Sequence, residues 1–284
     1  MNAEIELIAG YWTLAGDTNP FAKSEISPFP LCDRIEAAAS AGYRGIGLLH
    51  VDLMATIANH DLHEIKSMLE HNGMRYVELE FLVDWFADGA RRKASDAVRR
   101  DLLETAAILD ARHIKVAPDI DGAVYQLSRV VDEFALLCRE AAEYGAAIAL
   151  EMMPFSQINN FSRALSLVES AGAPNGGLLL DLWHVARGGM AYTEVAIVPT
   201  RRIVSVELDD ADAEPQGSLW EDTLHCRRLC GEGALRPREF IAALRGAGYR
   251  GVYSGEIISR DHRKRGLKEA ARRSFETTMN QFGD

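Results

Sequence analysis

Four acidic residues stand at the ends of four successive strand-like segments of this chain. Each closes or nearly closes a short apolar run, and the four are Glu151, Asp181, Glu207 and Glu256. An ionised carboxylate at the end of an apolar strand is costly to desolvate, so four in succession call for a shared partner. A divalent metal ion is the partner that fits this pattern. Oxygen ligands suit Mg or Mn, whereas an added histidine would favour Zn or Co.

Strand-like and helix-like segments alternate along the whole chain, which indicates repeated βα units and a parallel sheet. We expect strands near residues 5–9, 44–49, 75–80, 112–117, 147–151, 177–181, 202–208 and 250–257. The helices expected between them cover 31–41, 60–72, 94–109, 124–144, 161–171, 237–247 and 267–282. Eight such units predict an α/β fold, a (β/α)8 TIM barrel that forms a single domain over residues 1–284. In that fold the carboxyl ends of the strands share one face, so the four acids would meet there.

The composition argues against nucleic acid and membrane as partners. The formal net charge is -11, which repels phosphate backbones, and no apolar run reaches the roughly 20 residues that span a bilayer. The first residues, Met1–Glu6, lack the basic and apolar regions of a signal peptide, which predicts a cytoplasmic protein. The four cysteines are expected to be reduced thiols in such a compartment.

Several motifs in the second half of the chain give a more specific indication. Asp181-Leu-Trp-His184 has an Asp-x-x-His spacing, and the segments 204–210, 231–235 and 248–256 follow it. With Glu151, these motifs resemble the xylose isomerase-like TIM barrels of the sugar phosphate isomerase/epimerase family. The resemblance implies that one divalent ion is held at the ends of strands 5 to 8. The matching positions are Glu151, Asp181, Glu207 and Glu256.

The resemblance also implies roles for individual residues. Glu151 and Glu256 would be the acid/base pair, and His184 would contact a substrate oxygen. The chain departs from the family at Glu207, which stands where the family has histidine, and this favours Mn or Mg over Zn or Co. Four carboxylates around a dication leave excess negative charge. Either one of them is protonated, or Glu207 turns away, or cationic groups such as Lys115 and Arg228 offset the excess.

Further substrate contacts are expected from side chains at the same strand ends. The four tryptophans, Trp12, Trp85, Trp183 and Trp220, all follow predicted strands, where they could wall a pocket or plug the barrel rim. His50 closes the second strand and Lys115 lies within the fourth. The substrate-binding set predicted from the sequence is His184, Lys115, His50, Trp12, Trp183 and Arg228.

These features predict a metal-dependent isomerase or epimerase of a small polyhydroxy carbonyl compound, a sugar or keto-polyol, that transfers a proton through an enediolate. A lyase or dehydratase on a cyclic keto-polyol is an alternative, because it requires the same first proton abstraction. A non-catalytic sugar-binding barrel is another, since Glu207 could mark a decayed site. An apurinic endonuclease barrel is disfavoured by the acidic charge and the few histidines. A carbohydrate-like small molecule is the expected partner, and a homo-oligomer is compatible with the sequence.

Overall fold

Eight parallel strands close into a barrel in sequence order in the computed structural model, which describes residues 5–120, 122 and 124–283. The strands are β1 (Leu7–Ala9), β2 (Gly45–Leu49), β3 (Tyr76–Leu82), β4 (His113–Val116), β5 (Ala147–Glu151), β6 (Gly176–Asp181), β7 (Ile203–Leu208) and β8 (Tyr253–Gly255). Every neighbouring pair is parallel, and β1 pairs with both β2 and β8. The predicted TIM barrel is confirmed.

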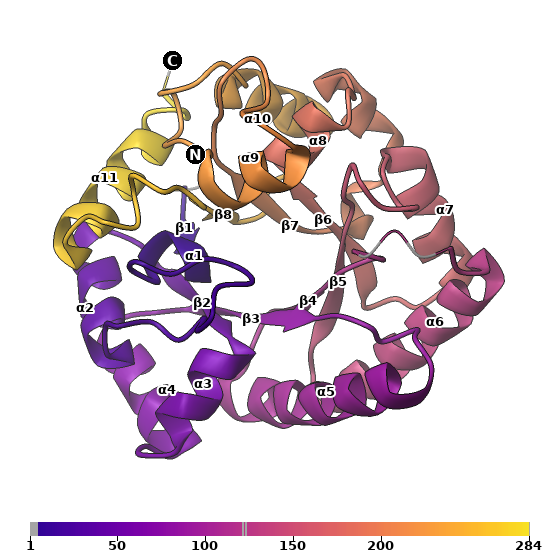
Figure 1. Ribbon diagram of the computed structural model, residues 1–284, viewed down its shortest axis with the longest axis horizontal. Coiled ribbons are helices and arrows are strands. Elements are labelled where there is room, and N and C mark those ends of the chain that lie inside the picture. The colour runs from indigo at the N-terminus through magenta and orange to yellow at the C-terminus, as the bar shows by residue number, and fades with distance from the viewer. Residues whose placement is uncertain (1–4, 121, 123, 284) are drawn as a thin grey trace.

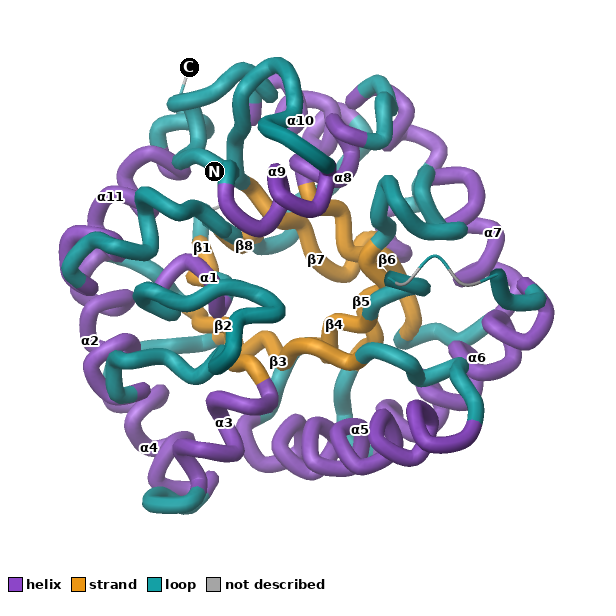
Figure 2. The backbone as a smooth tube through the Cα atoms, viewed as in Figure 1, coloured by secondary structure: helices purple, strands orange, loops and turns teal. Residues whose placement is uncertain are grey.

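Helices surround the barrel, as Figures 1 and 2 show. They are α1 (Tyr11–Leu14), α2 (Leu31–Ala41), α3 (His50–Ile57), α4 (Leu62–His71), α5 (Gly89–Leu109), α6 (Leu127–Glu143), α7 (Phe161–Ala171), α8 (Leu182–Arg187), α9 (Leu219–His225), α10 (Pro237–Gly246) and α11 (Leu267–Met279), with 3-10 helices η1 (Tyr192–Ile197) and η2 (Thr200–Arg202). Helix α6 illustrates why they pack outside: Val130, Phe134, Leu137 and Ala141 form one buried stripe at helical spacing. None of the described helices is both long and apolar enough to cross a membrane.

The predicted strands and long helices match the observed ones closely, and α2 and α7 have the predicted bounds. The sequence missed the short helices α1, α3 and α8, which begin at or just after a strand end, and α9, which lies in the long connection after β7. Four to eight residues are too few to display a helical period of apolar positions. This matters for the site, because these short helices carry several of the side chains that surround it.

Helix α1 ties the first strand to the last. The Thr13 hydroxyl donates to the Gly255 carbonyl at 2.7 Å and accepts the Ile257 N–H at 3.0 Å. Helix α1 also lies close to β2, where a Cβ added to Gly47 would stand 2.7 Å from the Tyr11 nitrogen. Only glycine at position 47 leaves room for this approach. The barrel is therefore closed by side-chain contacts at its carboxyl end as well as by the strand ladder.

The barrel interior is polar below the strand ends. Ser205 donates to Glu78 at 3.1 Å, and the His113 ring lies 3.5 Å from the same carboxylate. Burial lowers the pKa of His113 to about 4. The pKa of Glu78 is lowered despite its burial, because His113 and Lys115 stabilise the carboxylate. The barrel interior thus places further charged side chains below the four strand-end acids.

Candidate metal and catalytic centre

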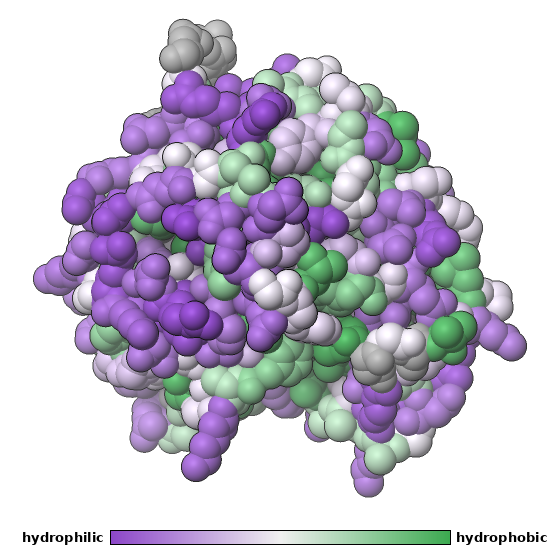
Figure 3. Space-filling view, turned by 45° about the horizontal axis from the view of Figure 1, so that its top comes forward, coloured by the Kyte–Doolittle hydropathy of each residue, from purple (hydrophilic) through white to green (hydrophobic). Residues whose placement is uncertain are grey.

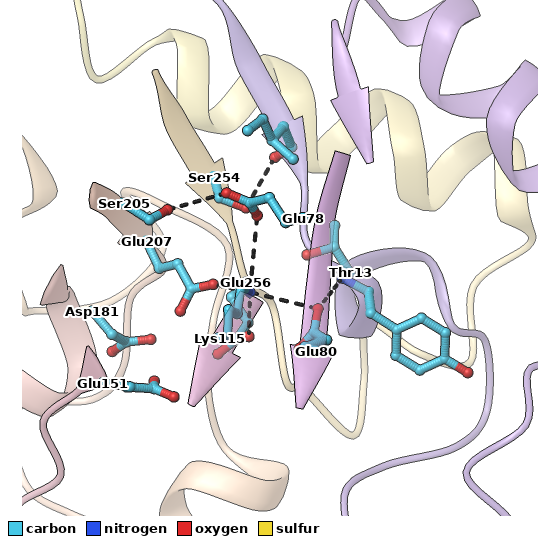
Figure 4. A network of polar contacts seen from close by, with 12 residues as sticks. Thr13, Glu78, Glu80, Lys115, Glu151, Asp181, Ser205, Glu207, Ser254 and Glu256 are labelled. Carbon is cyan, nitrogen blue, oxygen red and sulfur yellow. Dashed lines mark hydrogen bonds and ion pairs between the residues drawn. The ribbon is translucent and has the colours of Figure 1, made fainter. Parts of the chain in front are cut away.

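The four predicted acids converge at the carboxyl end of the barrel. Glu151 and Asp181 are the last residues of β5 and β6, Glu207 lies in β7, and Glu256 follows β8 directly. One oxygen of each lies within 4.8 Å of the others, and all four side chains are buried. Figure 4 shows them directed toward a common space. The strand ladder explains this: Asp181 pairs with Glu207 in register, and Glu207 pairs with Ser254, two residues before Glu256.

Lys115 of β4 places a buried ammonium group among these acids. Its Nζ contacts Glu207 and lies 3.5 Å from Glu80 and 3.6 Å from Glu256. Burial alone would lower the Lys115 pKa, but the attraction of these carboxylates raises it well above its usual value. Lys115 is 1% exposed and lies beside the acids below the cavity, so we propose a charge-balancing role for it in place of substrate contact.

Arg227 is a second buried cation, and the sequence did not predict it. Its guanidinium donates to Asp181 and Asp209 at 2.6 Å each, and its Nη1 lies 3.3 Å from Glu256. The predicted Arg228 lies instead near the surface and pairs with Asp212 at 2.8 Å. Successive residues of extended chain point to opposite sides, and Arg228 forms a β-bridge with Asp210. The adjacent residue, Arg227, is therefore the one that points inward.

The acids of the cluster differ in how readily they lose a proton. Burial raises the pKa of Glu207 well above its usual range and that of Glu256 to about 8, with neighbouring acids adding to the effect. Burial would also raise the pKa of Asp181, but Arg227 and His184 outweigh it and hold this pKa below its usual value. Neighbouring carboxyl groups with pKa values pushed apart are suited to acid and base roles.

The chemistry of this cluster fits a divalent cation. Buried acids outnumber the buried cations here. Lys115 and Arg227 are the two cations, and the seven acids around them are Glu78, Glu80, Glu151, Asp181, Glu207, Asp209 and Glu256. In the described part of the chain, the Glu207 Oε2 atom is buried without a hydrogen-bond partner. A bound cation would satisfy that oxygen and offset the excess charge.

His184 offers a second way to complete a metal site. Asp181 caps α8 by accepting the His184 backbone N–H at 2.9 Å, which explains the Asp-x-x-His spacing. The His184 Nε2 lies 3.1 Å from a Glu151 oxygen. Glu151, Asp181 and His184 also form a compact set of potential ligands, this one with a nitrogen. The structure thus brings His184 to the acids, as the sequence predicted.

Two other predicted substrate contacts, His50 and Trp183, do not border the cavity above the acids. His50 begins α3, and its ring bonds Asp101 of α5 at 2.9 Å. Trp183 is fully buried, donates to Asp222 at 2.8 Å and packs against Arg227. We therefore withdraw His50 and Trp183 as substrate contacts. The Trp183 ring instead packs against the Arg227 guanidinium group.

Glu80 is a further residue that the sequence analysis did not single out. It lies in β3, lines the cavity above the acids, and accepts the Tyr11 N–H at 3.3 Å. Burial raises its pKa. The signal was present, because Glu78 and Glu80 alternate with apolar residues in a strand and therefore both face the barrel interior.

A cavity of about 310 Å³ opens above the acids. Glu151, Glu256 and His184 lie at its floor, and Trp12 of α1 and Trp220 of α9 form part of its walls. Trp85 and Trp183, by contrast, are buried against the barrel rim. A larger hollow of about 650 Å³ lies beside Arg228 and Glu232, but none of the four acids borders it. The smaller cavity is thus the candidate active site.

Comparison with known proteins places this geometry in a family. A model of the xylose isomerase-like TIM barrel family matches residues 35–277. The chain belongs to the xylose isomerase-like TIM barrel family. This confirms the resemblance to sugar phosphate isomerases and epimerases that the motifs indicated.

Individual relatives of this xylose isomerase-like barrel include both isomerases and a dehydratase. Inosose isomerase from Halalkalibacterium halodurans is 26% identical over 253 residues, which cover 86% of this chain and 89% of the relative. A 3-dehydroshikimate dehydratase from Pseudomonas putida is 25% identical over 81% of this chain, but only 36% of that protein is matched. The IOLI protein, solved with a bound zinc atom, has the same fold, with a TM-score of 0.85 and 22% identity over 98% of both chains.

Proposed function

We propose that this xylose isomerase-like barrel is a divalent-metal-dependent isomerase or epimerase of a polyhydroxy ketone. The observation that carries the proposal is the convergence of four acids within 4.8 Å, two of which, Glu151 and Glu256, border a cavity; the other two are Asp181 and Glu207. The inosose isomerase relatives, which are similar over most of their length, support the same reaction class. Proton transfer next to a carbonyl explains why two carboxyl groups stand on different sides of the site.

Glu151 and Glu256 are proposed as the acid/base pair. They come from β5 and from the end of β8, so a carbon chain bound between them would present a different face to each. The raised pKa of Glu256, about 8, lets this carboxyl group carry a proton near neutral pH. His184 lies within reach of Glu151 and of a substrate oxygen in the cavity. A divalent ion in the acidic set would polarise the substrate carbonyl.

The identity of the metal is a separate proposal. The set of four carboxylates favours Mn or Mg, as the sequence predicted, while the set with His184 favours Zn or Co. The zinc atom of the IOLI structure supports the second set. Metal analysis of the purified protein decides between them. The variant Asp181→Ala removes a member of both sets, and it should lose the ion; unchanged metal content in this variant would exclude the proposed site.

A lyase is the second proposed function, because relatives named 3-dehydroshikimate dehydratase match most of this chain. A dehydratase of a cyclic keto-polyol begins with the same proton abstraction and differs only in the fate of the enolate. The same two carboxyl groups serve both reactions. Product analysis therefore distinguishes the two functions, whereas proton exchange tests their common first step.

That common step is tested by deuterium exchange in heavy water. The wild type is incubated with ketoses, keto-inositols and hydroxy-keto acids, beside Glu151→Gln and Glu256→Gln. General acid/base groups typically contribute ~10²–10⁴-fold to rate, and we expect losses in the upper part of that range. Glu104→Gln, an exposed glutamate on α5, is the matched control and should exchange at the wild-type rate. Full-rate exchange in both active-site variants would refute the two-carboxylate mechanism.

A further inference from the structure

The walls of the candidate active site are apolar. Above the acids the cavity is bordered mainly by the aromatic and aliphatic side chains Trp12, Leu49, Phe81, Ile120, Phe155 and Trp220. Leu49 and Phe81 lie at the ends of β2 and β3, and the others come from different βα connections, so the apolar wall continues around the opening. In Figure 3, apolar side chains gather near the middle of the molecule and hydrophilic ones border them.

Polar groups on these walls are few among the described residues. Apart from the floor residues Glu151, His184 and Glu256 and the two indole N–H groups, the polar side chains that border the cavity are Glu25, Glu80, Thr223 and Arg227. Glu80 accepts the Tyr11 N–H, and Arg227 donates to Asp181 and Asp209. The Glu25 carboxylate already accepts the Phe21 backbone N–H at 2.5 Å. The Thr223 hydroxyl already accepts from Arg227 at 3.0 Å. A substrate with hydroxyl groups along its whole length would leave several of them buried without partners, which weakens binding.

Three aromatic rings from distant parts of the chain meet at the cavity mouth. Phe155 stacks on Trp220 with ring centroids 4.2 Å apart and planes 26° apart. Phe21, from the loop between α1 and α2, meets the same indole edge-on at 5.7 Å. The Phe21 side chain is 65% exposed, so solvent reaches it from outside. Such an exposed aromatic group beside a cavity is typical of a binding surface for another apolar group.

We infer that the substrate is amphipathic: its hydroxyl groups are confined to a hydroxy-ketone end that reaches the acids, and an aryl or comparable apolar ring fills the aromatic walls. This narrows the polyhydroxy ketone of the proposed function to one with an apolar end. The hydroxy-ketone end rests on the proposed function, whereas the apolar end rests on the walls alone. The volume of about 310 Å³ is near the lower limit for small-molecule pockets. It accommodates the reacting carbons and one attached ring.

Binding of two matched hydroxy-ketones tests this inference. In 1-hydroxy-3-phenylpropan-2-one a phenyl group replaces one hydroxyl group of dihydroxyacetone. We expect the metal-loaded protein to bind the phenyl compound at least about tenfold more tightly, as measured by calorimetry, because the ring contacts add to the shared hydroxy-ketone contacts. A ketohexose serves as the larger polyhydroxy comparison. Equal or tighter binding of either polyhydroxy compound overturns the inference, and so does absence of binding by the phenyl compound.

Variants locate the effect in the cavity. Trp220→Ala should weaken binding of the phenyl compound about tenfold and leave dihydroxyacetone binding nearly unchanged. Phe21→Ala, at an exposed loop position, is the second variant and should shift affinity in the same direction. Tyr144→Ala removes a partly exposed aromatic ring just after α6, next to the start of β5, and should have no effect. An undiminished preference for the phenyl compound in both cavity variants contradicts the inference.

Deuterium exchange at the hydroxymethyl carbon of the same two compounds separates this inference from the proposed function. A phenyl preference in binding without exchange would refute the acid/base assignment and leave the amphipathic cavity supported. Exchange with dihydroxyacetone and no phenyl preference would support the acid/base pair and refute the amphipathic substrate.

Discussion

Replacement of Lys115 by methionine tests whether one buried ammonium group balances the acidic cluster. Its Nζ contacts Glu207 and lies 3.5–3.9 Å from Glu80, Glu256 and Glu78. At an effective dielectric constant of 20, one unit charge at 4 Å attracts another by about 4 kcal/mol. Because burial raises the pKa values of Glu207, Glu80 and Glu256, only part of that attraction is realised.

Loss of one partner of a buried ion pair typically costs about 3–5 kcal/mol, and we expect Lys115→Met to lower the free energy of unfolding by this amount. The measurement is urea denaturation of the metal-free protein near pH 7. Lys66→Met is the matched control, since Lys66 also pairs with one acid but at the surface, and it should change stability little. The double variant Lys115→Met/Glu207→Gln should recover part of the loss, because it removes both members of the closest pair.

A loss below about 1 kcal/mol for Lys115→Met would refute this reasoning. Additive effects in the double variant would also contradict it, because they would mean that Lys115 and Glu207 do not interact energetically.

Three further predictions follow from the charges and contacts of the site. Glu207→His should raise zinc affinity relative to manganese affinity in metal titrations, and no shift would place residue 207 outside the metal site. In the metal-free protein the pKa of Glu256 is about 8 against an ordinary value of 4.5. The folded protein holds the Glu256 proton more tightly than the unfolded chain does, so this proton stabilises the fold fully below about pH 4.5. The stabilisation falls by about 1.4 kcal/mol per pH unit up to about pH 8. Glu256→Gln lacks this titrating group, so the free energy of unfolding of the variant should rise relative to that of the wild type over this pH range. If the difference between the two free energies does not change with pH, the raised pKa is refuted. His50→Ala should leave kcat/KM unchanged, because its ring bonds Asp101 outside the cavity; a tenfold loss would return His50 to the substrate contacts.

The fold and the acidic set could be read from the sequence because both depend on local patterns. Apolar runs of strand length predicted the bounds of β5 and β6 to within one residue, and these bounds placed an acid at the end of each strand. The Asp-x-x-His spacing was informative because Asp181 caps the helix that carries His184. In each case the residues that cooperate are neighbours in sequence or occupy equivalent places in successive units.

The remaining parts of the site depend on contacts that no local pattern encodes. Arg227 and Arg228 are chemically identical neighbours, and only the β-bridge to Asp210 decides which one faces the acids. His50 follows an apolar strand just as the acids do, yet it begins a helix and turns toward α5. The apolar cavity wall assembles single residues from distant connections, so its composition emerges only after folding.

The tie between Thr13 and the end of β8 has a consequence for how the protein folds. The Thr13 hydroxyl bonds Gly255 and Ile257, about 240 residues away along the chain, and Glu256 lies between those two residues. Contacts of such long range form late, since the entropy of closing the loop must be met first. The β7–β8 ladder already positions Glu256, whose N–H donates to the Leu208 carbonyl at 3.1 Å, so all four acids can come together within the second half of the barrel. The bonds to Thr13 add contacts on both sides of Glu256 once the two ends of the sheet have joined. Closure of the barrel therefore restricts one member of the acidic set from the side of the first strand, which couples order at the site to the junction of the two chain ends.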